Sequence, residues 1–208
     1  MLKNIIYISG SVIVFFVGLI IYGIILNIRE VPLQEAMAER GITQIRNPSI
    51  VVDLKNYRLN LFSDKTLLKS YKAVFGKSNN VDDNSMTGNF TPIGDYIICD
   101  KLPNYKYHKF LRINFPNEKD AADALRKNII SQLQFETILK TVEKNICPPS
   151  QEIFGKEIGI HGIGKYNFIF KNLPFSYNWT NGSIALSNEN IDELYSVVKI
   201  GTPVKIIK

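Results

Sequence analysis

The apolar residues of this 208-residue chain follow two different patterns. From Ile5 to Leu26 there are 22 consecutive residues without a charge, rich in Ile, Val and Phe. As a helix this segment rises about 33 Å, enough to cross the hydrocarbon core of a bilayer. Beyond about residue 28 apolar and polar positions alternate, and roughly 180 residues remain, the size of one ordinary domain. The pattern predicts a transmembrane anchor over 1–28, a spacer over 29–47 and one folded domain over 48–208.

An uncleaved anchor is favoured over a cleaved signal peptide. A signal peptide has a shorter apolar region and a small-residue cleavage site close behind it. Here the triplet Ala36-Met37-Ala38 lies ten residues downstream, past Arg29 and Glu30. Counting positive charges on the two sides of the segment does not decide its orientation.

Several short segments of the folded part have the pattern of β-strands. Ser49–Leu54 is a β-branched and aliphatic run, and after the break at Lys55-Asn56 the apolar residues of Tyr57–Phe62 alternate, which predicts a β-hairpin. Further strands are expected at Tyr71–Phe75, Tyr96–Cys99, Leu111–Phe115, Glu157–His161, Ile184–Leu186 and Thr202–Ile207.

Fewer segments have helical spacing. Apolar residues recur at helical intervals between Asp120 and Asn145, which predicts one long helix or two short ones as an amphipathic cover on the sheet. Ser187 is placed to cap a helix that Gly201 ends, and a short spacer helix is expected over Leu33–Arg40. Many strands with few helices predict a β-rich α+β fold with mixed sheets, preceded by one transmembrane helix.

Charge and cysteine content exclude some classes of function. The net charge is +6, but the lysines are scattered among acids, so the chain lacks the basic patch of a nucleic-acid-binding protein and no nucleic acid is expected as a partner. Cys99 and Cys147 could pair in an oxidising compartment, but they have no spacing typical of a metal or redox site, and two buried free thiols are the default expectation. A zinc site would need both cysteines together with His108 and His161, so none is expected.

Candidate chemistry lies in two glycine-containing segments. Ile158-Gly159-Ile160-His161-Gly162 is followed by Trp179-Thr180-Asn181-Gly182-Ser183. A lone histidine at a strand end is usually structural, and a Gly-Ser pair is usually a turn. Together, however, a histidine beside glycine and a nucleophile-type side chain on a tight turn with free amides have the parts of an acyl-transfer site.

These segments carry a resemblance to a known family that extends over the whole chain beyond the anchor. The order of motifs resembles the L,D-transpeptidase catalytic domain, also called the YkuD domain. Phe115-Pro116-Asn117 with Asp120, and Trp179-Thr180, resemble the branch that includes wall amidases or endopeptidases. The motifs are Val51-Val52-Asp53-Leu54, Thr91-Pro92-Ile93-Gly94-Asp95-Tyr96, His161-Gly162, Thr180-Asn181-Gly182-Ser183-Ile184-Ala185-Leu186-Ser187-Asn188 and Gly201-Thr202-Pro203-Val204.

The resemblance implies roles for particular residues. His161 matches the catalytic base, Ser183 stands at the nucleophile position, and the amides of Gly182 and Ser183 match the oxyanion site. Substrate-binding positions are Gly162, Trp179, Thr180 and Asn181. The family keeps a cysteine where this chain has Ser183, and Asn181 and Ala185 replace the His and Arg of many members.

The resemblance also implies partners and location. The expected substrate is a diaminopimelate-containing stem peptide of peptidoglycan, held as an acyl-enzyme without metal or cofactor. The anchor would sit in the inner membrane with the domain facing the periplasm or cell envelope. We expect the His161 and Ser183 side chains within about 3 to 4 Å of each other in one open cleft.

The serine leaves several hypotheses open, because a serine hydroxyl does not ionise near neutral pH as a thiol does. One is a slow or inactive member, a pseudoenzyme that binds peptidoglycan as a regulator or scaffold. Another is a working serine-type hydrolase or transpeptidase, and a third is a serine introduced by design to trap an inactive state. A plain anchored structural domain without wall chemistry is the remaining alternative.

Overall fold

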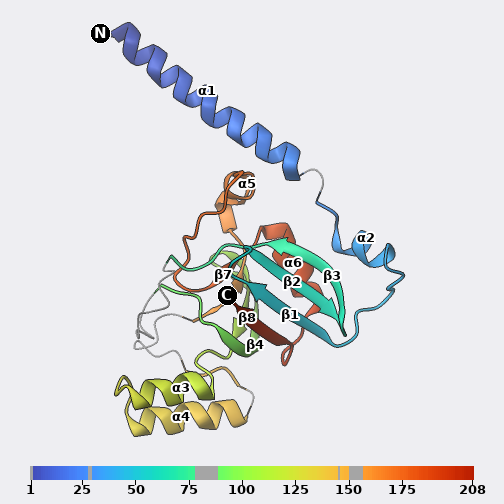
Figure 1. The fold of residues 1–208 in the computed structure, drawn as a ribbon, viewed down its shortest axis with the longest axis vertical. Helices are drawn as coiled ribbons and strands as arrows, with labels where there is room; N and C mark the ends of the chain where they lie inside the picture. The colour runs from blue at the N-terminus through green and yellow to red at the C-terminus, as the bar shows by residue number, and fades with distance from the viewer. Residues whose placement is uncertain (1, 28–29, 78–88, 145, 150–156) are drawn as a thin grey trace.

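A long apolar helix projects from a domain built on one curled sheet (Figure 1). The computed structural model describes residues 2–27, 30–77, 89–144, 146–149 and 157–208. Helix α1 (Leu2–Asn27) contains the stretch Lys3–Ile25, whose mean hydropathy is 2.5. That is the length and composition of a transmembrane anchor or of a signal sequence.

The domain is a mixed sheet of eight strands in the order β3-β2-β1-β8-β4-β5-β6-β7. The pairs β1–β8 and β6–β7 are parallel, and the other pairs are antiparallel. The strands are β1 (Pro48–Asp53), β2 (Arg58–Ser63), β3 (Thr66–Lys72), β4 (Gly94–Tyr105), β5 (His108–Ile113), β6 (Gly159–His161), β7 (Ile184–Ala185) and β8 (Pro203–Ile207). The predicted α+β class is confirmed.

The hairpin predicted from the first alternating runs is confirmed as β1–β2, with Asp53 opposite Arg58. The Asp53 carboxylate accepts hydrogen bonds from the Asn56 amide at 2.9 Å and its side chain at 2.7 Å, which closes the turn. Alternate residues of both strands are buried, as a sheet with one face on the core requires.

The third strand begins earlier than predicted. It spans Thr66–Lys72 rather than Tyr71–Phe75, because a tight turn at Asp64, with φ 52°, returns the chain directly onto β2. Beyond its end, Val74 and Gly76 form isolated bridges with Ala185 and Thr180. The segment after β3 therefore pairs with the edge of β7 that does not face β6.

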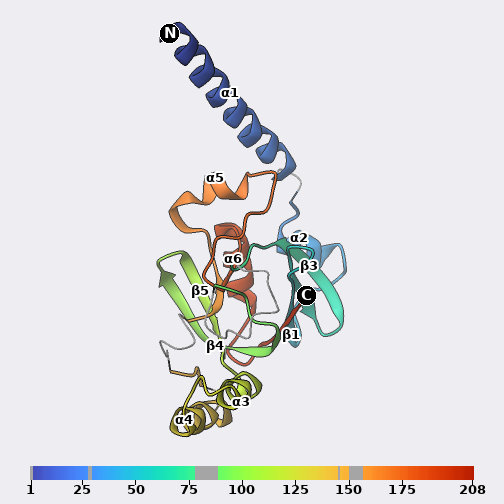
Figure 2. The same cartoon turned by 60° about the vertical axis from the view of Figure 1, so that its left-hand side comes forward.

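Six α-helices and one short 3-10 helix, η2 (Gly164–Tyr166), are among the described residues. The α-helices after α1 are α2 (Leu33–Ala38), α3 (Glu118–Arg126), α4 (Gln132–Glu143), α5 (Asn167–Lys171) and α6 (Asn188–Val197). The segment 120–145 forms two helices, each begun by a capping box. They lie as a pair at one end of the sheet and do not cover a face as expected, as Figure 1 and Figure 2 show.

Helix α6 begins as predicted and ends earlier. The Ser187 hydroxyl accepts a hydrogen bond from the Asn190 amide at 3.2 Å. The helix stops at Val197, and Gly201, with φ 89°, lies in the turn that follows. Helix α6 packs against β5 and β6, the strand that carries His161.

The expectation of two free thiols is wrong, because Cys99 and Cys147 form a disulfide with Cα atoms 5.1 Å apart. Cys99 lies on β4, and Cys147 follows α4 where the chain returns to the sheet. A separation of 48 residues gives no sign of that return. The bond ties the α3–α4 pair to the domain.

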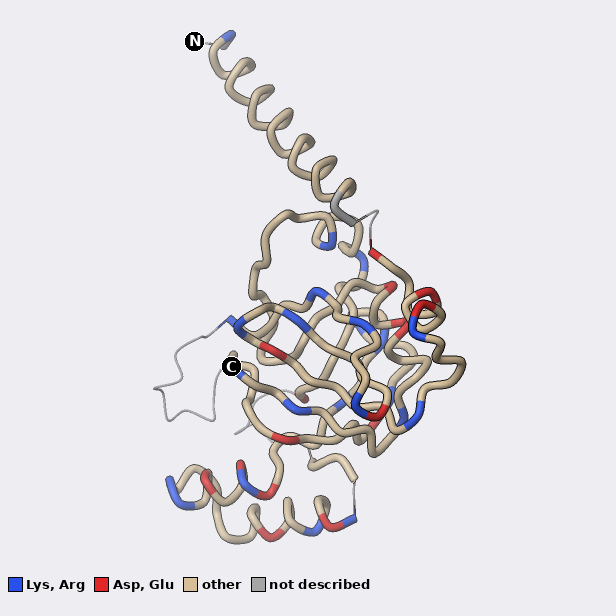
Figure 3. The backbone as a smooth tube through the Cα atoms, turned by 45° about the vertical axis from the view of Figure 1, so that its right-hand side comes forward, with Lys and Arg blue, Asp and Glu red and all other residues tan. Residues whose placement is uncertain are grey.

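Among the described residues of the domain, lysines and arginines lie interspersed with aspartates and glutamates (Figure 3). Several form ion pairs, such as Lys69 with Glu193 at 2.7 Å and Arg112 with Glu157 at 2.9 Å.

Candidate active site

The register of two parallel strands places His161 and Ser183 on one face of the sheet. His161 of β6 is opposite Ala185 of β7. Two residues earlier on each strand, Ser183 lies opposite Gly159, whose amide donates to the Ser183 hydroxyl at 3.2 Å. Because side chains alternate along a strand and paired residues point the same way, His161 and Ser183 project to the same side.

The orientation of the His161 ring is fixed by one backbone contact. Its Nδ1 lies 2.6 Å from the carbonyl oxygen of Gly162. A carbonyl only accepts, so Nδ1 carries the proton and Nε2 is left with a lone pair. This is the tautomer that a general base requires.

Burial keeps the His161 ring neutral. The residue is only 3% exposed, and desolvation lowers its pKa from 6.5 to about 4, although the hydrogen bond to Gly162 acts in the opposite direction. At neutral pH the imidazole is therefore uncharged and able to accept a proton.

An aromatic enclosure surrounds the imidazole. Tyr107, in the turn between β4 and β5, stacks on it with ring centroids 5.0 Å apart. Trp179 meets it edge to face at 5.7 Å, and Tyr105 and Phe110 lie at 6.3 and 6.4 Å. These rings supply the burial that lowers the pKa. Tyr107 was missed in the sequence because it lies 54 residues before His161 with no motif to link the two.

The Ser183 hydroxyl contacts backbone groups at the start of β6 and just before it. Besides accepting from Gly159, it lies 3.5 Å from the carbonyl of Glu157. Among the described residues the structure has no hydrogen bond between Ser183 and His161. Ser183 is 9% exposed and His161 is 3% exposed, so both side chains are buried in this conformation.

The backbone before Ser183 requires glycine. Gly182 has φ 103°, and a Cβ there would lie 2.6 Å from the carbonyl oxygen of Phe90 and 2.8 Å from Cδ1 of Ile158. The hydroxyl of Thr180 donates to the carbonyl of Ser183 at 2.5 Å and tightens the same turn. Thr180 is buried, and Asn181 at the tip of the turn is exposed.

The loop after His161 is held by Asn188, whose part in this arrangement the sequence did not reveal. Its side chain accepts from the Gly164 amide at 2.9 Å and donates to the Gly164 carbonyl at 3.0 Å. A Cβ at Gly162 would lie 2.7 Å from that Asn188 side chain. Gly162 thus allows the loop that orients His161 to approach the start of α6.

A cavity of about 290 Å³ opens on the other side of Trp179. Its wall includes Trp179 and Ala185, but neither His161 nor Ser183. Three lysines (Lys69, Lys72 and Lys171) and three glutamates (Glu30, Glu189 and Glu193) line it together with apolar residues around α5. The cavity therefore offers both signs of charge beside the indole of Trp179.

The other residues considered for a metal site have partners of their own. The two cysteines are bonded to each other, and Nε2 of His108 lies 2.8 Å from a carboxylate oxygen of Asp192. Across the described part of the chain, no three His, Cys, Asp or Glu side chains gather as metal ligands.

Solved structures similar to this one include a protein of Bdellovibrio bacteriovorus, with 20% identity and a TM-score of 0.48, covering 78% of this chain and 48% of that one. An L,D-transpeptidase from Mycobacterium smegmatis has 15% identity and a TM-score of 0.46, covering 78% and 59%. One from Xylanimonas cellulosilytica has 12% identity and a TM-score of 0.43, covering 85% and 70%. This chain thus spans about half to three-fifths of the first two.

A comparison with curated proteins found no match. The YkuD family, described as the L,D-transpeptidase catalytic domain, matches residues 47–206, which is more than half of the chain and contains every residue of the candidate site. The chain therefore belongs to the L,D-transpeptidase catalytic domain family.

Proposed function

We propose that this protein binds diaminopimelate-containing stem peptides of peptidoglycan at His161 and Ser183 and acts on them slowly or not at all. One observation carries the proposal. The β6–β7 register directs the side chains of His161 and Ser183 to one face of the sheet. The His161 imidazole is neutral, and its Nδ1 is hydrogen-bonded to the Gly162 carbonyl. A base in the correct tautomer, on the same face of the sheet as a hydroxyl on a glycine turn, has the parts of an acyl-transfer site.

The reaction would proceed by acyl transfer. The nucleophile at position 183 attacks the peptide carbonyl, its proton passes to Nε2 of His161, and the C–N bond breaks as the leaving amine takes that proton. An incoming amine or water then releases the acyl group. The amides of Gly182 and Ser183 are the proposed donors to the oxyanion, on a turn that its glycine and Thr180 hold in place.

The serine weakens the attack step. A thiol beside a histidine is partly ionised before substrate arrives, whereas a serine hydroxyl must lose its proton during attack. The lowered pKa of His161 makes the imidazole a weak base, which increases this difficulty. We therefore assign slow turnover at most to the chain as it stands.

The cavity beside Trp179 supports a role in peptide binding for that residue. Diaminopimelate carries ammonium and carboxylate groups, and the wall contains both lysines and glutamates. Lys69 already pairs with Glu193 at 2.7 Å and Lys171 with Glu189 at 2.5 Å, so a zwitterionic ligand would exchange partners with these pairs. Gly162, Thr180 and Asn181 complete the proposed contact surface.

The disulfide supports an envelope-facing domain. Structural disulfides persist in oxidising compartments and are rare in the cytosol. With Cys99 and Cys147 bonded, the domain belongs outside the cytoplasm, and α1 then crosses the inner membrane with its N-terminus inside. The disulfide supports this orientation, which charge counting alone leaves open.

A non-catalytic envelope scaffold is the second candidate. It is favoured by the contacts of Ser183, whose hydroxyl is bonded to the Gly159 amide and not to His161. In that case the site would hold a stem peptide without breaking it.

The experiment that separates the two candidates is Ser183→Cys in the full chain, purified in detergent. Restoring a thiol should raise muropeptide turnover on the order of 10² to 10⁴-fold, and a carbapenem should give a mass-shifted adduct. The matched controls are Ser183→Ala and the pair Ser183→Cys with His161→Ala, both of which should be silent. A cysteine variant that folds, binds muropeptide and captures no carbapenem would assign the site to binding alone.

A further inference from the structure

A cluster of large apolar side chains is exposed around α5. Between residues 166 and 177, six such side chains are 38–60% exposed: Tyr166, Phe168, Ile169, Phe170, Phe175 and Tyr177. We call these six the aromatic cap. Phe170, Phe175 and Tyr177 also line the cavity beside Trp179. An exposed apolar cluster of this size marks a surface that meets something apolar.

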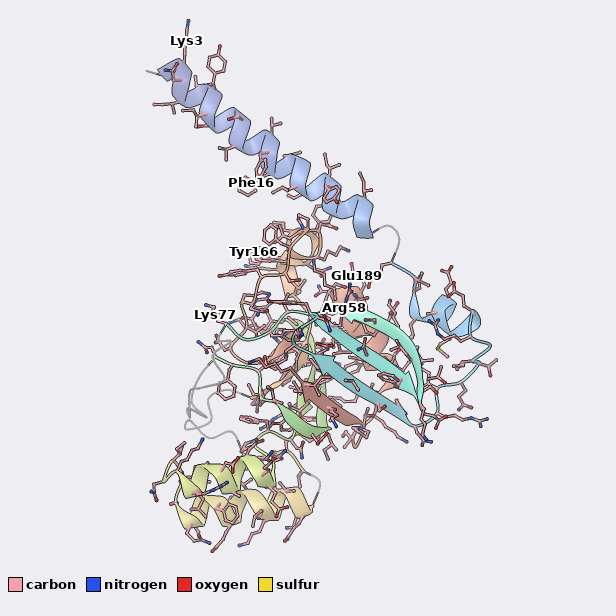
Figure 4. The ribbon with its side chains drawn as sticks, in the orientation of Figure 1. Lys3, Phe16, Arg58, Lys77, Tyr166 and Glu189 are labelled. Carbon is pink, nitrogen blue, oxygen red and sulfur yellow. A yellow bond between two sulfur atoms is a disulfide. The ribbon has the colours of Figure 1, made fainter. Side chains whose placement is uncertain are left out.

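The aromatic cap lies against the end of α1. Gly23 of α1 is buried, and a Cβ added there would overlap the backbone carbonyl of Asn172 at the end of α5. Figure 1 and Figure 2 both show α5 as the part of the domain nearest to α1, and Figure 4 shows Tyr166 on that side.

The contact between Gly23 and Asn172 also fixes the level of the domain relative to the bilayer. Gly23 lies two residues before Ile25, where the apolar stretch ends, a rise of about 3 Å along the helix. A bilayer that surrounds α1 therefore has its boundary at the level of Asn172, and the aromatic cap on both sides of that residue meets the same layer.

The spacer independently keeps the domain close. Asn190 of α6 donates to the Glu30 carboxylate at 2.7 Å, and the Leu33 amide donates to Glu193 at 3.1 Å. From Asn27 at the end of α1 to Glu30 there are three residue steps, which span at most about 11 Å. The spacer is thus hydrogen-bonded to α6 of the domain within a few residues of the end of α1.

We propose that the aromatic cap sits in the interfacial layer of the membrane that α1 crosses. This inference rests on the proposed anchorage by α1. Aromatic side chains favour the boundary between hydrocarbon and headgroups, and Lys165, exposed beside Tyr166, suits an anionic headgroup. The lipid surface fits better than a second copy, because the cap continues the apolar surface of α1 at the depth where that surface ends.

Seating the cap places the candidate site close to the membrane. Phe170 lies 6.3 Å from Trp179, and Trp179 lies 5.7 Å from His161, measured between ring centroids. Only two ring contacts therefore separate the membrane surface from His161, so the domain would reach stem peptides close to the inner membrane.

The test places a tryptophan in the cap of the full chain. Phe168→Trp is reconstituted in vesicles of phosphatidylethanolamine and phosphatidylglycerol that carry nitroxide on the acyl chain near the headgroup. Leu133→Trp, on α4 and 74% exposed, is the matched control at the far end of the domain. Trp179 is the only native tryptophan and contributes equally to both.

We expect the nitroxide to quench the indole at 168 at least twofold more than that at 133. Adding Phe175→Glu and Tyr177→Glu to the reporter should lower quenching to the control level. Equal quenching at both positions in protein that floats with vesicles overturns the inference alone. Protein that does not float with the vesicles overturns the anchorage as well. If the nitroxide does not quench the indole at 168, and that indole becomes shielded from water only when many protein molecules share a vesicle, the cap is assigned to contact with a second copy. Activity of Ser183→Cys in detergent is independent of all these outcomes.

Discussion

The ring of Tyr107 is stacked on the imidazole of His161, with centroids 5.0 Å apart and planes 26° from parallel. The two residues come from the β4–β5 turn and from β6, which the sheet brings together. Because desolvation is the main cause of the low pKa of His161, a ring that covers the imidazole controls its protonation.

Tyr107→Ala should therefore raise the pKa of His161 from about 4 toward 6.5. Water would reach one face of the imidazole and stabilise its charged form. NMR titration of the ring protons measures this, with His108→Gln to assign the two histidines. Tyr166→Ala, which removes an exposed ring, is the control and should leave the titration unchanged. An unmoved pKa in Tyr107→Ala would show that the remaining rings alone keep the site dry.

The stability of the domain should depend on pH through His161. The folded pKa lies below the unfolded value, so the stability is fully present above pH 6.5 and is lost as the pH falls toward 4. A shift of this size corresponds to roughly 3 kcal/mol. His161→Gln should remove that part of the slope, measured as the free energy of unfolding in urea between pH 7 and pH 4. Parallel curves for the two proteins would contradict the burial of a neutral imidazole.

The disulfide should contribute strongly to stability, because it closes a loop of 48 residues in the unfolded chain. Replacing both Cys99 and Cys147 by serine should lower the free energy of unfolding by about 2–4 kcal/mol. A reductant should lower the stability of the unchanged protein to the same level and leave the double variant unaffected. A reductant that has no effect on the unchanged protein would mean that the bond does not form.

The sequence predicted those features that local pattern determines. The β1–β2 hairpin follows from alternation around Lys55-Asn56, and the start of α6 follows from Ser187 before an apolar stripe. The family was identified from ordered motifs and is confirmed by the match over 47–206. The roles of His161 and Ser183 stay predictions until the variants are measured.

The features that were missed depend on contacts between distant segments. Tyr107 covers His161 only because β5 pairs with β6, and Cys147 reaches Cys99 only because the chain returns after α4. The position of α3 and α4 at the end of the sheet likewise depends on where β5, the strand before them, ends. Helical spacing shows which face of a helix is apolar and not which surface it covers.

Gly182→Ala tests whether the turn before Ser183 is built for its conformation. Alanine at φ 103° is strained, and its Cβ would lie 2.6 Å from the Phe90 carbonyl, so either the turn or the segment at Phe90 must move. We expect a loss of about 1–3 kcal/mol in the free energy of unfolding. In the Ser183→Cys background we also expect loss of carbapenem capture, because the amides proposed for the oxyanion would be displaced. Gly10→Ala, on α1 with open space around its Cβ, is the matched control and should change neither quantity. If Gly182→Ala retains full stability and capture, the glycine is not needed for the turn, and the oxyanion assignment to the amides of residues 182 and 183 fails.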